Sequence, residues 1–397
     1  MPRFDPFPGL RYDLASVAIA DVTAPPYDVI DGTDRASLLA RHPDNIVRVD
    51  LPNPDGIDGD EPYIEAAAVL DRWRDDGLLG TDAPSFYGYR MEYTAPDGTP
   101  RHTTGVVGAL ELSRPGEGGI LPHEHTTPKA KSDRLNLLRA TRLNLSSVWG
   151  LSPASGLTTL IEPVDERVTT WSDDDGVTHS AWVIADADRQ AAIAAAVGAH
   201  PVVIADGHHR YETSLAYRDE RREAGDPGGS EAVMTWIVEL ADEQLTVLPI
   251  HRLLVGVGDD VSLPDALAPW FEVRPAPPID DGIAAHQAEA GCLVLVERDR
   301  CWDLVPRPDA FDGVRDLDSS RLDAARSGLG PHDVIYQHGV EHVMARVASG
   351  QARAGVLLRP ATVAQILRIA DGGERMPPKT TFFHPKPRTG VVLRSIS

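Results

Sequence analysis

The sequence predicts an α+β fold in which mixed sheets pack with helices, and two kinds of pattern predict it. Apolar residues recur at helical spacing in residues 63–77, and an alanine-rich stretch at 187–198 is typical of a further helix. Paired apolar runs around short polar turns indicate two hairpins, at 85–112 and 233–250. A mixture of helices and hairpins favours α+β over a doubly wound α/β sheet.

The remaining elements follow in order along the chain. In the first 200 residues we expect a helix at 63–77, strands at 85–93 and 104–112, and helices at 131–145 and 187–198. Beyond them we expect strands at 202–205, 233–240, 245–250 and 292–297 and a helix near 341–348. The sequence then divides into an N-terminal α+β domain at 1–155, a phosphate-binding region at 156–255, and a C-terminal α+β region at 256–397 whose terminal loop returns to the site.

Length and composition are those of a soluble globular protein of two or three domains. The chain has 397 residues, 42% of them hydrophobic and 25% charged. It contains no run of 18 apolar residues, and its N-terminus lacks the apolar core of a secretory signal. We therefore expect a cytoplasmic protein, with Cys292 and Cys301 reduced; their spacing fits no metal motif.

The formal net charge of −22 restricts the classes of partner. A strongly negative protein repels polyanions, and no basic stripe interleaved with aromatic residues is present. Nucleic acid is therefore not expected as the partner, and the lack of a long apolar run argues against a membrane. The expected partner is a small hydroxylated substrate, and a homodimer is compatible with the sequence.

The most informative segment is residues 206–210, Asp-Gly-His-His-Arg, between a buried strand and a helix. A strand that breaks at glycine and opens a helix presents backbone N–H groups and the positive end of the helix dipole, which favours phosphate. Gly207 allows close approach of the anion, and Arg210 offers a planar fork for phosphate oxygens. Asp206 suits a metal ligand or a proton acceptor. The alternative is a tight turn whose side chains bond to backbone.

A second candidate site is His123-Glu124-His125-Thr126. In a strand His123 and His125 would share one face, as ligands of zinc or iron do, but two ligands do not complete a metal site. Alternatively the two histidines and Thr126 contact the substrate, with Glu124 as general base. A polar loop that caps the next helix is the third interpretation.

Three further segments carry candidate binding residues. The prolines before Tyr27 and Asp28 stiffen that loop, which suits either substrate binding or a rigid turn. Arg252, at a strand end, offers a further anion contact or a solvated side chain. Lys379 and Thr380 begin a polar-aromatic segment that either covers a nucleotide or forms a docked strand.

The basic helix at 131–142 and several missing motifs complete the sequence evidence. Arg139 and Arg142 lie three residues apart and either face phosphate together or form a solvated helix face with Lys131 and Arg134. The chain has no P-loop, no Gly-x-Gly-x-x-Gly after a strand and no Gly-x-Ser-x-Gly elbow. The familiar nucleotide-binding and hydrolase folds are therefore poor fits.

Six ordered motifs together resemble a known family. They are Pro-Phe-Pro-Gly-Leu at 6–10, Ala-Pro-Pro-Tyr-Asp-Val at 24–29, His-Glu-His-Thr at 123–126, Ala-Asp-Gly-His-His-Arg at 205–210, Pro-Ile-His-Arg at 249–252 and Lys-Thr-Thr-Phe-Phe at 379–383. The series resembles the prokaryotic family called domain of unknown function 1015 over essentially the whole chain. That family is largely defined by sequence, so the resemblance implies little biochemistry.

A local resemblance implies more chemistry. The turn at 206–210 is similar to the nucleotide site of the ParB and sulfiredoxin superfamily, which includes free serine kinases. The resemblance implies a ParB/sulfiredoxin-like nucleotide-binding core that takes ATP or ADP with Mg²⁺. The phosphate-binding positions that it implies are Gly207, His208, His209 and Arg210. Asp206 would then lie beside the transferred group or its magnesium, and Glu124 would be the catalytic glutamate, assigned by role and not by alignment. A sulfiredoxin reaction is excluded because the turn lacks its cysteine.

The leading hypothesis is a nucleotide-dependent phosphotransferase acting on a hydroxyl of a small polar metabolite, such as serine or a hydroxy acid. Its catalytic candidates are Glu124, Asp206 and His208. In a variant of the reaction the phosphorylated hydroxyl leaves, which gives a dehydratase. Two alternatives stay open: a metal-dependent hydrolase or lyase that uses the histidine clusters, and a non-catalytic nucleotide-binding regulator.

Overall fold

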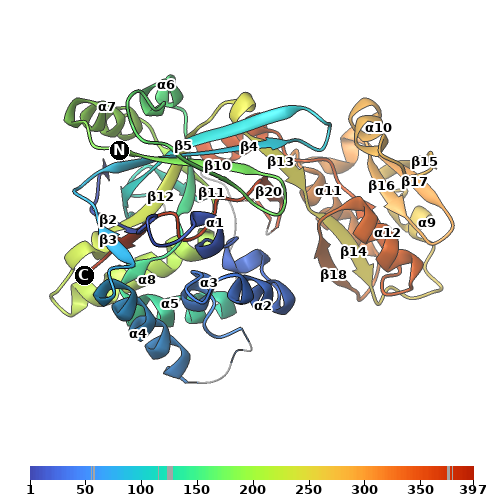
Figure 1. The fold of residues 1–397 in the computed structure, drawn as a ribbon. Helices are drawn as coiled ribbons and strands as arrows, with labels where there is room; N and C mark the ends of the chain where they lie inside the picture. Colours follow the sequence, from blue (N-terminus) through green and yellow to red (C-terminus); the bar gives the residue numbers. More distant parts are fainter. Residues whose placement is uncertain (55, 57–58, 115, 123–127, 373–375, 378) are drawn as a thin grey trace. The chain divides into compact units, whose positions relative to one another are not determined.

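The computed structural model describes residues 1–397 apart from 55, 57–58, 115, 123–127, 373–375 and 378. The chain forms two compact units: Met1–Thr246 joined by Pro385–Ser397, and Val247–His384 (Figure 1). The second unit is therefore inserted between two segments of the first. Each unit combines helices with mixed or antiparallel sheets, which confirms the predicted α+β class.

A nine-stranded mixed sheet dominates the first unit, in the order β6-β11-β8-β12-β5-β4-β10-β9 with β1 also paired to β5. Its strands are β1 (Phe4–Asp5), β4 (Phe86–Thr94), β5 (Pro100–Glu111), β6 (Ile120–Pro122), β8 (Val148–Ser152), β9 (Thr169–Ser172), β10 (Thr178–Ile184), β11 (Val202–Asp206) and β12 (Ala232–Glu239). Two pairs of strands are parallel: β11 with β6, and β8 with β12. The other pairs are antiparallel.

One predicted hairpin is confirmed and the other is wrong. β4 and β5 pair as antiparallel neighbours, as the pattern at 85–112 predicts. β12 instead has both edges occupied, by β5 and β8, so the next strand, β13 (Thr246–Pro249), cannot pair with it. β13 pairs with β20 (Thr381–His384). Part of the terminal polar-aromatic segment therefore forms a strand, which agrees with the docked-strand interpretation of that segment.

Helices cover the sheet of the first unit. α6 (Leu157–Ile161) and α7 (Ala187–Gly198) contribute to a core that also contains Phe4, Phe86 and Tyr211. On another side α8 (His208–Glu223) packs on α5 (Pro128–Thr141), and α5 packs on α4 (Glu61–Asp75) (Figure 1). α5 ends four residues before the predicted end, because Arg142 has φ 51° and β7 follows immediately.

A small four-stranded sheet joins both segments of the first unit. Its order is β3 (Leu79–Thr81), β2 (Gly9–Tyr12), β21 (Leu393–Ser395) and β7 (Leu143–Asn144). Around it lie the short helices α1 (Ile19–Val22), η1 (Tyr27–Val29), α2 (Gly32–Arg41) and α3 (Val47–Asp50), and a second core forms there with α4. β21, near the red end of the chain in Figure 1, lies between β2 and β7.

The observed units differ from the predicted division at residues 155 and 255. β8 ends at Ser152 and β11 begins at Val202, yet both belong to the same sheet, so a boundary at 155 would divide one sheet. The first unit instead continues to Thr246 and includes Pro385–Ser397.

The second unit contains a six-stranded sheet in the order β15-β17-β16-β19-β14-β18. These strands are β14 (His251–Val255), β15 (Phe271–Pro275), β16 (Leu293–Val296), β17 (Cys301–Pro306), β18 (Asp333–Gln337) and β19 (Ala354–Leu357). Its helices are α9 (Leu263–Leu267), α10 (Ile283–Ala290), α11 (Asp318–Ala325), α12 (Val340–Ala348) and α13 (Val363–Asp371), with 3-10 turns η4 (Pro308–Phe311) and η5 (Arg326–Gly328). Separate cores fill the two faces of the sheet, and both cysteines are free thiols.

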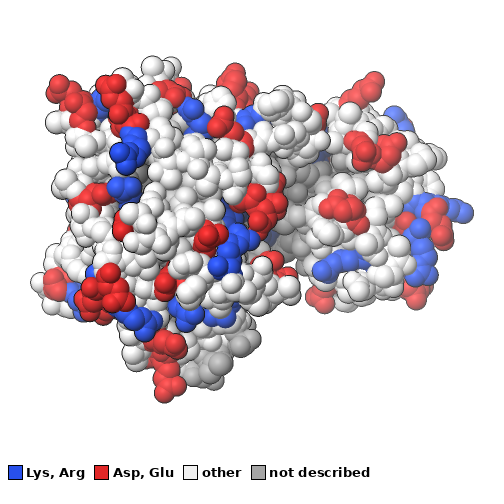
Figure 2. Space-filling view, in the orientation of Figure 1, with Lys and Arg blue, Asp and Glu red and all other residues white. Residues whose placement is uncertain are grey.

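Charged side chains are dispersed on the visible surface. On the face seen in Figure 2, the described Lys and Arg side chains lie in small groups among Asp and Glu side chains. Among the described residues, no helix combines the length and the apolar character that crossing a membrane requires.

Candidate functional site

The turn at 206–210 connects β11 to α8 through a backbone conformation that favours glycine. Gly207 has φ 85°, in the left-handed region. A Cβ atom at this position would lie 3.0 Å from Nε of Arg210, so a side chain would also displace the guanidinium group. The glycine therefore permits both the tight turn and the position of Arg210. α8 begins directly after it, at His208, and its first N–H groups point toward the turn.

Asp206 holds two cations at the start of α8. Its Oδ2 accepts a hydrogen bond from Nη2 of Arg210 at 2.7 Å, and its Oδ1 accepts one from Nζ of Lys386 at 2.7 Å. Lys386 also donates to Oδ2 of Asp28 at 3.0 Å. The loop at Asp28, the end of β11, the first turn of α8 and the C-terminal segment thus meet at one point within the first unit.

The electrostatics of this cluster fix its charge state. Burial raises the pKa of the Asp206 carboxyl, but the charges of Lys386 and Arg210 outweigh burial and hold that pKa well below its usual range. Burial lowers the pKa of the Lys386 ammonium, but the charges of Asp206 and Asp28 have the larger, opposite effect. The pKa of Lys386 is therefore raised above its usual range. Asp206 is therefore ionised and Lys386 protonated at neutral pH, which makes Asp206 a weak proton acceptor.

Beside the cluster lies a cavity, here called the polar cavity, which Arg210 also lines. Its polar lining residues are Asp50, Arg134, Asn144, Ser146, Arg210, Thr213 and Ser214. Buried Arg134 donates to the backbone oxygen of Asp50 at 2.7 Å and to its Oδ1 at 3.3 Å. The Arg134 guanidinium also lies 4.1 Å from the ring centre of Tyr27, in a cation–π contact. Tyr27 is thus held close to the cavity.

Two buried oxygens at the polar cavity lack partners. Among the described residues, neither Oδ2 of Asp50 nor Oγ1 of Thr213 has a hydrogen-bond partner. Burial raises the pKa of the Asp50 carboxyl, against the opposing effect of the Arg134 charge. Buried polar atoms are normally satisfied, so unsatisfied ones beside a cavity indicate that water or a polar ligand binds there.

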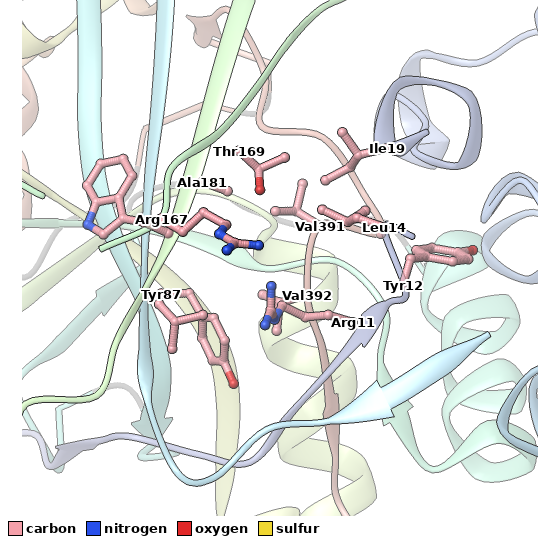
Figure 3. A pocket seen from close by; sticks show the side chains of 13 residues that line it. Arg11, Tyr12, Leu14, Ile19, Tyr87, Arg167, Thr169, Ala181, Val391 and Val392 are labelled. Carbon is pink, nitrogen blue, oxygen red and sulfur yellow. The ribbon is translucent and has the colours of Figure 1, made fainter. Parts of the chain in front are cut away.

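A second cavity of the first unit lies elsewhere (Figure 3). The guanidinium groups of Arg11 and Arg167 point into it, between Tyr87 and apolar side chains. Arg11 is paired with Asp82, at 2.6 Å from Nε to Oδ2, whereas no described carboxylate lies within ion-pair distance of Arg167. This cavity shares no lining residue with the polar cavity.

The structure brings some of the predicted site residues together. Tyr27, Asp28 and the turn at 206–210 gather in the first unit, with His208 buried and His209 half-buried at the start of α8. The four residues of the second candidate site, His123, Glu124, His125 and Thr126, lie outside the described residues.

Three predicted contact residues belong to the second unit. Arg252 is buried, donates to the backbone oxygen of Ile250 and lies 4.6 Å from the ring centre of Tyr336. Lys379 has φ 57° and is exposed, and Oγ1 of Thr380 lies 3.1 Å from Oγ of Ser319. These contacts occur within that unit.

The site residues predicted from the sequence did not include Lys386, Asp50 or Arg134. Lys386 lies seven residues after Lys379, at the end of the polar-aromatic segment 379–386, and its charge beside Pro385 was the available signal. Arg134 is buried, whereas Arg139 on the same helix is exposed and paired with Glu220, at 2.6 Å from Nη2 to Oε1. The solvated-face interpretation of this helix therefore holds for Arg139 and fails for Arg134.

Comparison with known proteins identifies a family. A family model described as "Protein of unknown function (DUF1015)" matches residues 4–323. No curated protein matches the chain.

Solved structures give distant similarities. A conserved hypothetical protein from Pyrococcus furiosus has a TM-score of 0.37 at 14% identity, over 69% of this chain and 90% of that one. A free serine kinase in complex with AMP has a TM-score of 0.37 at 14% identity, over 67% and 83%. SbnI with a C-terminal truncation, from Staphylococcus aureus, has a TM-score of 0.39 at 13% identity, over 71% and 84%.

Proposed function

The chain belongs to the DUF1015 family, and we propose that it is a nucleotide-dependent phosphotransferase acting on a hydroxyl of a small polar metabolite, such as serine or a hydroxy acid. The observation that carries this proposal is the half-buried Asp206 carboxylate, which fixes Arg210 and Lys386 at the N-terminus of α8. Dehydration after phosphorylation is a later step that the same activation permits.

The turn and its two cations provide a phosphate site. The N-terminus of a helix favours anions, and the planar fork of Arg210 matches phosphate oxygens. Asp206 holds both cations in place before a ligand arrives, so little reorganisation is needed when phosphate binds. Gly207, His208 and His209 supply the backbone of the same turn. In this proposal Asp206 positions the cations instead of accepting a proton.

ATP or ADP fits this site by charge, since its phosphates meet two cations and a helix N-terminus. Magnesium, bound with the nucleotide, neutralises phosphate charge. Asp28, whose side chain is one-third exposed, is the carboxylate best placed to hold it, because both oxygens of Asp206 already accept hydrogen bonds from cations.

The polar cavity is the proposed site of the hydroxylated acceptor. Arg210 lines this cavity and also belongs to the cation cluster, so an acceptor bound there lies next to the phosphates. Asp50 suits the role of general base better than Asp206 does, because burial raises its pKa whereas the cations lower that of Asp206. Glu124, the candidate that the sequence favours, stays the alternative base.

Calorimetric titration with ATP and ADP in the presence of magnesium tests the phosphate site. Arg210→Ala and Lys386→Met should each weaken binding at least tenfold, because each removes one cation held by Asp206. Arg139→Ala is the matched control, since its exposed pair with Glu220 lies outside the cluster. A folded wild-type chain that binds neither nucleotide contradicts the proposal.

A second measurement separates catalysis from regulation. Wild-type protein is incubated with labelled ATP or ADP and a panel of hydroxy acids and hydroxy amino acids, and phosphorylated product is measured. Asp50→Asn should lower turnover about 100-fold while nucleotide affinity is retained, as expected for loss of a general base. Saturable nucleotide binding without turnover of any acceptor would instead identify a non-catalytic regulator.

A further inference from the structure

The second unit contains a cluster of three metal-ligating side chains that the proposed function does not use. Among the described residues, His286, Cys292 and Asp303 form the group whose donor atoms all lie within 4.8 Å of one another. Nε2 of His286 lies 2.9 and 3.0 Å from the two oxygens of Asp303. Cys292 and Asp303 are buried, and the His286 side chain is 29% exposed.

Three elements bring these side chains together. His286 belongs to α10, Cys292 lies between that helix and β16 and immediately precedes the strand, and Asp303 belongs to β17. Asp303 is the direct cross-strand partner of Val294, and Cys292 lies two residues before Val294. Alternation along a strand therefore places Cys292 and Asp303 on the same face of the sheet.

Charge favours a divalent cation at this point. A buried carboxylate is costly unless hydrogen bonds or an opposite charge compensate it, and a cation bound between Asp303 and its neighbours would supply that charge. A thiolate, a carboxylate and a neutral imidazole together carry a charge of −2, which a divalent ion balances. Sulfur, nitrogen and oxygen are also the three donor types that zinc accepts in proteins.

We propose that His286, Cys292 and Asp303 bind one Zn²⁺ ion, which ties α10 to β16 and β17, with water as the fourth ligand on the side where His286 is exposed. On binding, the Sγ–H bond of Cys292 breaks, the sulfur electron pair goes to zinc, and the proton leaves to solvent. Burial, reinforced by the Asp303 charge, raises the pKa of the free Cys292 thiol to about 12, but a coordinated thiol is deprotonated outright.

The chain offers a matched control for this site. Cys301 is the only other cysteine of the sequence. It lies on β17 two residues before Asp303, so it shares the face of the sheet with Asp303 but does not belong to the cluster. A spectroscopic signal from a metal-bound thiolate in this protein must therefore come from Cys292 or Cys301, and the two serine variants distinguish them.

The test uses the full chain, stripped of metal by chelation and titrated with Zn²⁺ and with Co²⁺ as a visible probe. We expect one bound zinc per chain and a thiolate-to-cobalt charge-transfer absorption in the wild type and in Cys301→Ser. Cys292→Ser should lose this absorption, and His286→Gln should bind zinc at least tenfold more weakly. Circular dichroism checks that each variant is folded.

Two results would overturn the zinc site. One is a folded wild-type chain that binds no stoichiometric zinc and gives no thiolate-to-cobalt absorption. The other is loss of the absorption in Cys301→Ser with retention in Cys292→Ser. If Cys292→Ser fails to fold, His286→Gln decides, because the His286 side chain is partly exposed and its replacement should leave the fold intact. A His286→Gln variant that binds zinc as tightly as the wild type would contradict the site. None of these readouts depends on nucleotide binding in the first unit.

Discussion

At the scale of single residues, Lys386 controls the ionisation of the candidate site. Its ammonium group donates to Asp206 and Asp28, and its own side chain is only 10% exposed. Without it, Asp206 would keep a single cation, Arg210, against the cost of its own burial. Removing one of the two cations is costly because the charge of Asp206 is then only partly compensated.

Lys386→Met should therefore destabilise the protein by about 1.5–3 kcal/mol at pH 7, the contribution of a hydrogen bond between charged groups. The folded state lowers the pKa of Asp206, so this stabilisation is present above the ordinary carboxyl pKa and is lost as pH falls through the folded value. The folded state raises the pKa of Lys386, so the stabilisation is complete below the ordinary lysine pKa. It is lost as the pH rises through the pKa of Lys386 in the folded state. The deficit should thus be constant from about pH 5 to 9 and shrink outside that range.

Urea denaturation of the variant and the wild type across this pH range measures the deficit. Arg139→Ala serves as the control, because exposed ion pairs contribute about 0–1 kcal/mol. A Lys386→Met deficit no larger than that of the control would show that the ammonium does not stabilise the cluster.

At the scale of elements, the strand–turn–helix at β11 and α8 defines the site, and its sequence was sufficient to predict it. The apolar strand, the glycine and the helical pattern lie within one continuous segment, so the prediction needed no distant partner. The wrong hairpin at 233–250 shows the opposite case. The sequence pattern of β12 predicts half of a local hairpin. Its actual partners, β5 and β8, come from residues more than 80 positions earlier.

Gly207→Ala should weaken nucleotide binding and lower stability by about 1–2 kcal/mol, the cost of a left-handed conformation for a residue with a Cβ. The effect on binding arises because the new Cβ would lie 3.0 Å from Nε of Arg210. Calorimetry and thermal unfolding measure the two effects.

Gly225→Ala is the matched control for this prediction. Gly225 follows the other end of α8 with φ 73°, and a Cβ there meets nothing within 4 Å. It should cost similar stability without changing nucleotide affinity. Equal loss of affinity in both variants would mean that helix strain, and not the position of Arg210, governs binding.

At the scale of the whole molecule, the first unit is built from two segments of chain that the second unit separates. The later segment supplies Lys386 to the cation cluster and β21 to the four-stranded sheet. The contact between Lys386 and Asp206 joins residues 180 positions apart. Local sequence patterns contain no information about such a contact, which explains why the α+β class was predictable while Lys386 and the boundaries of the units were not.

Deletion of residues 385–397 should therefore abolish nucleotide binding and destabilise the first unit, because β2 and β7 both lose their shared neighbour β21. Calorimetry and thermal unfolding of the shortened chain measure both effects. Lys386→Met in the full chain separates them, since it removes the cation and keeps β21. A shortened chain that binds nucleotide with wild-type affinity would contradict the role of this segment.

Because the second unit is inserted, the ribosome synthesises the two segments of the first unit at different times. The ribosome makes Val247–His384 after Asp206 and Arg210 but before Lys386. At about 5–20 residues per second, this delays the lysine by roughly 7–30 s. During that interval the nascent chain contains Asp206 and Arg210 but does not yet contain Lys386. Prematurely terminated translation products should consequently be inert toward nucleotide, however well their earlier segments fold.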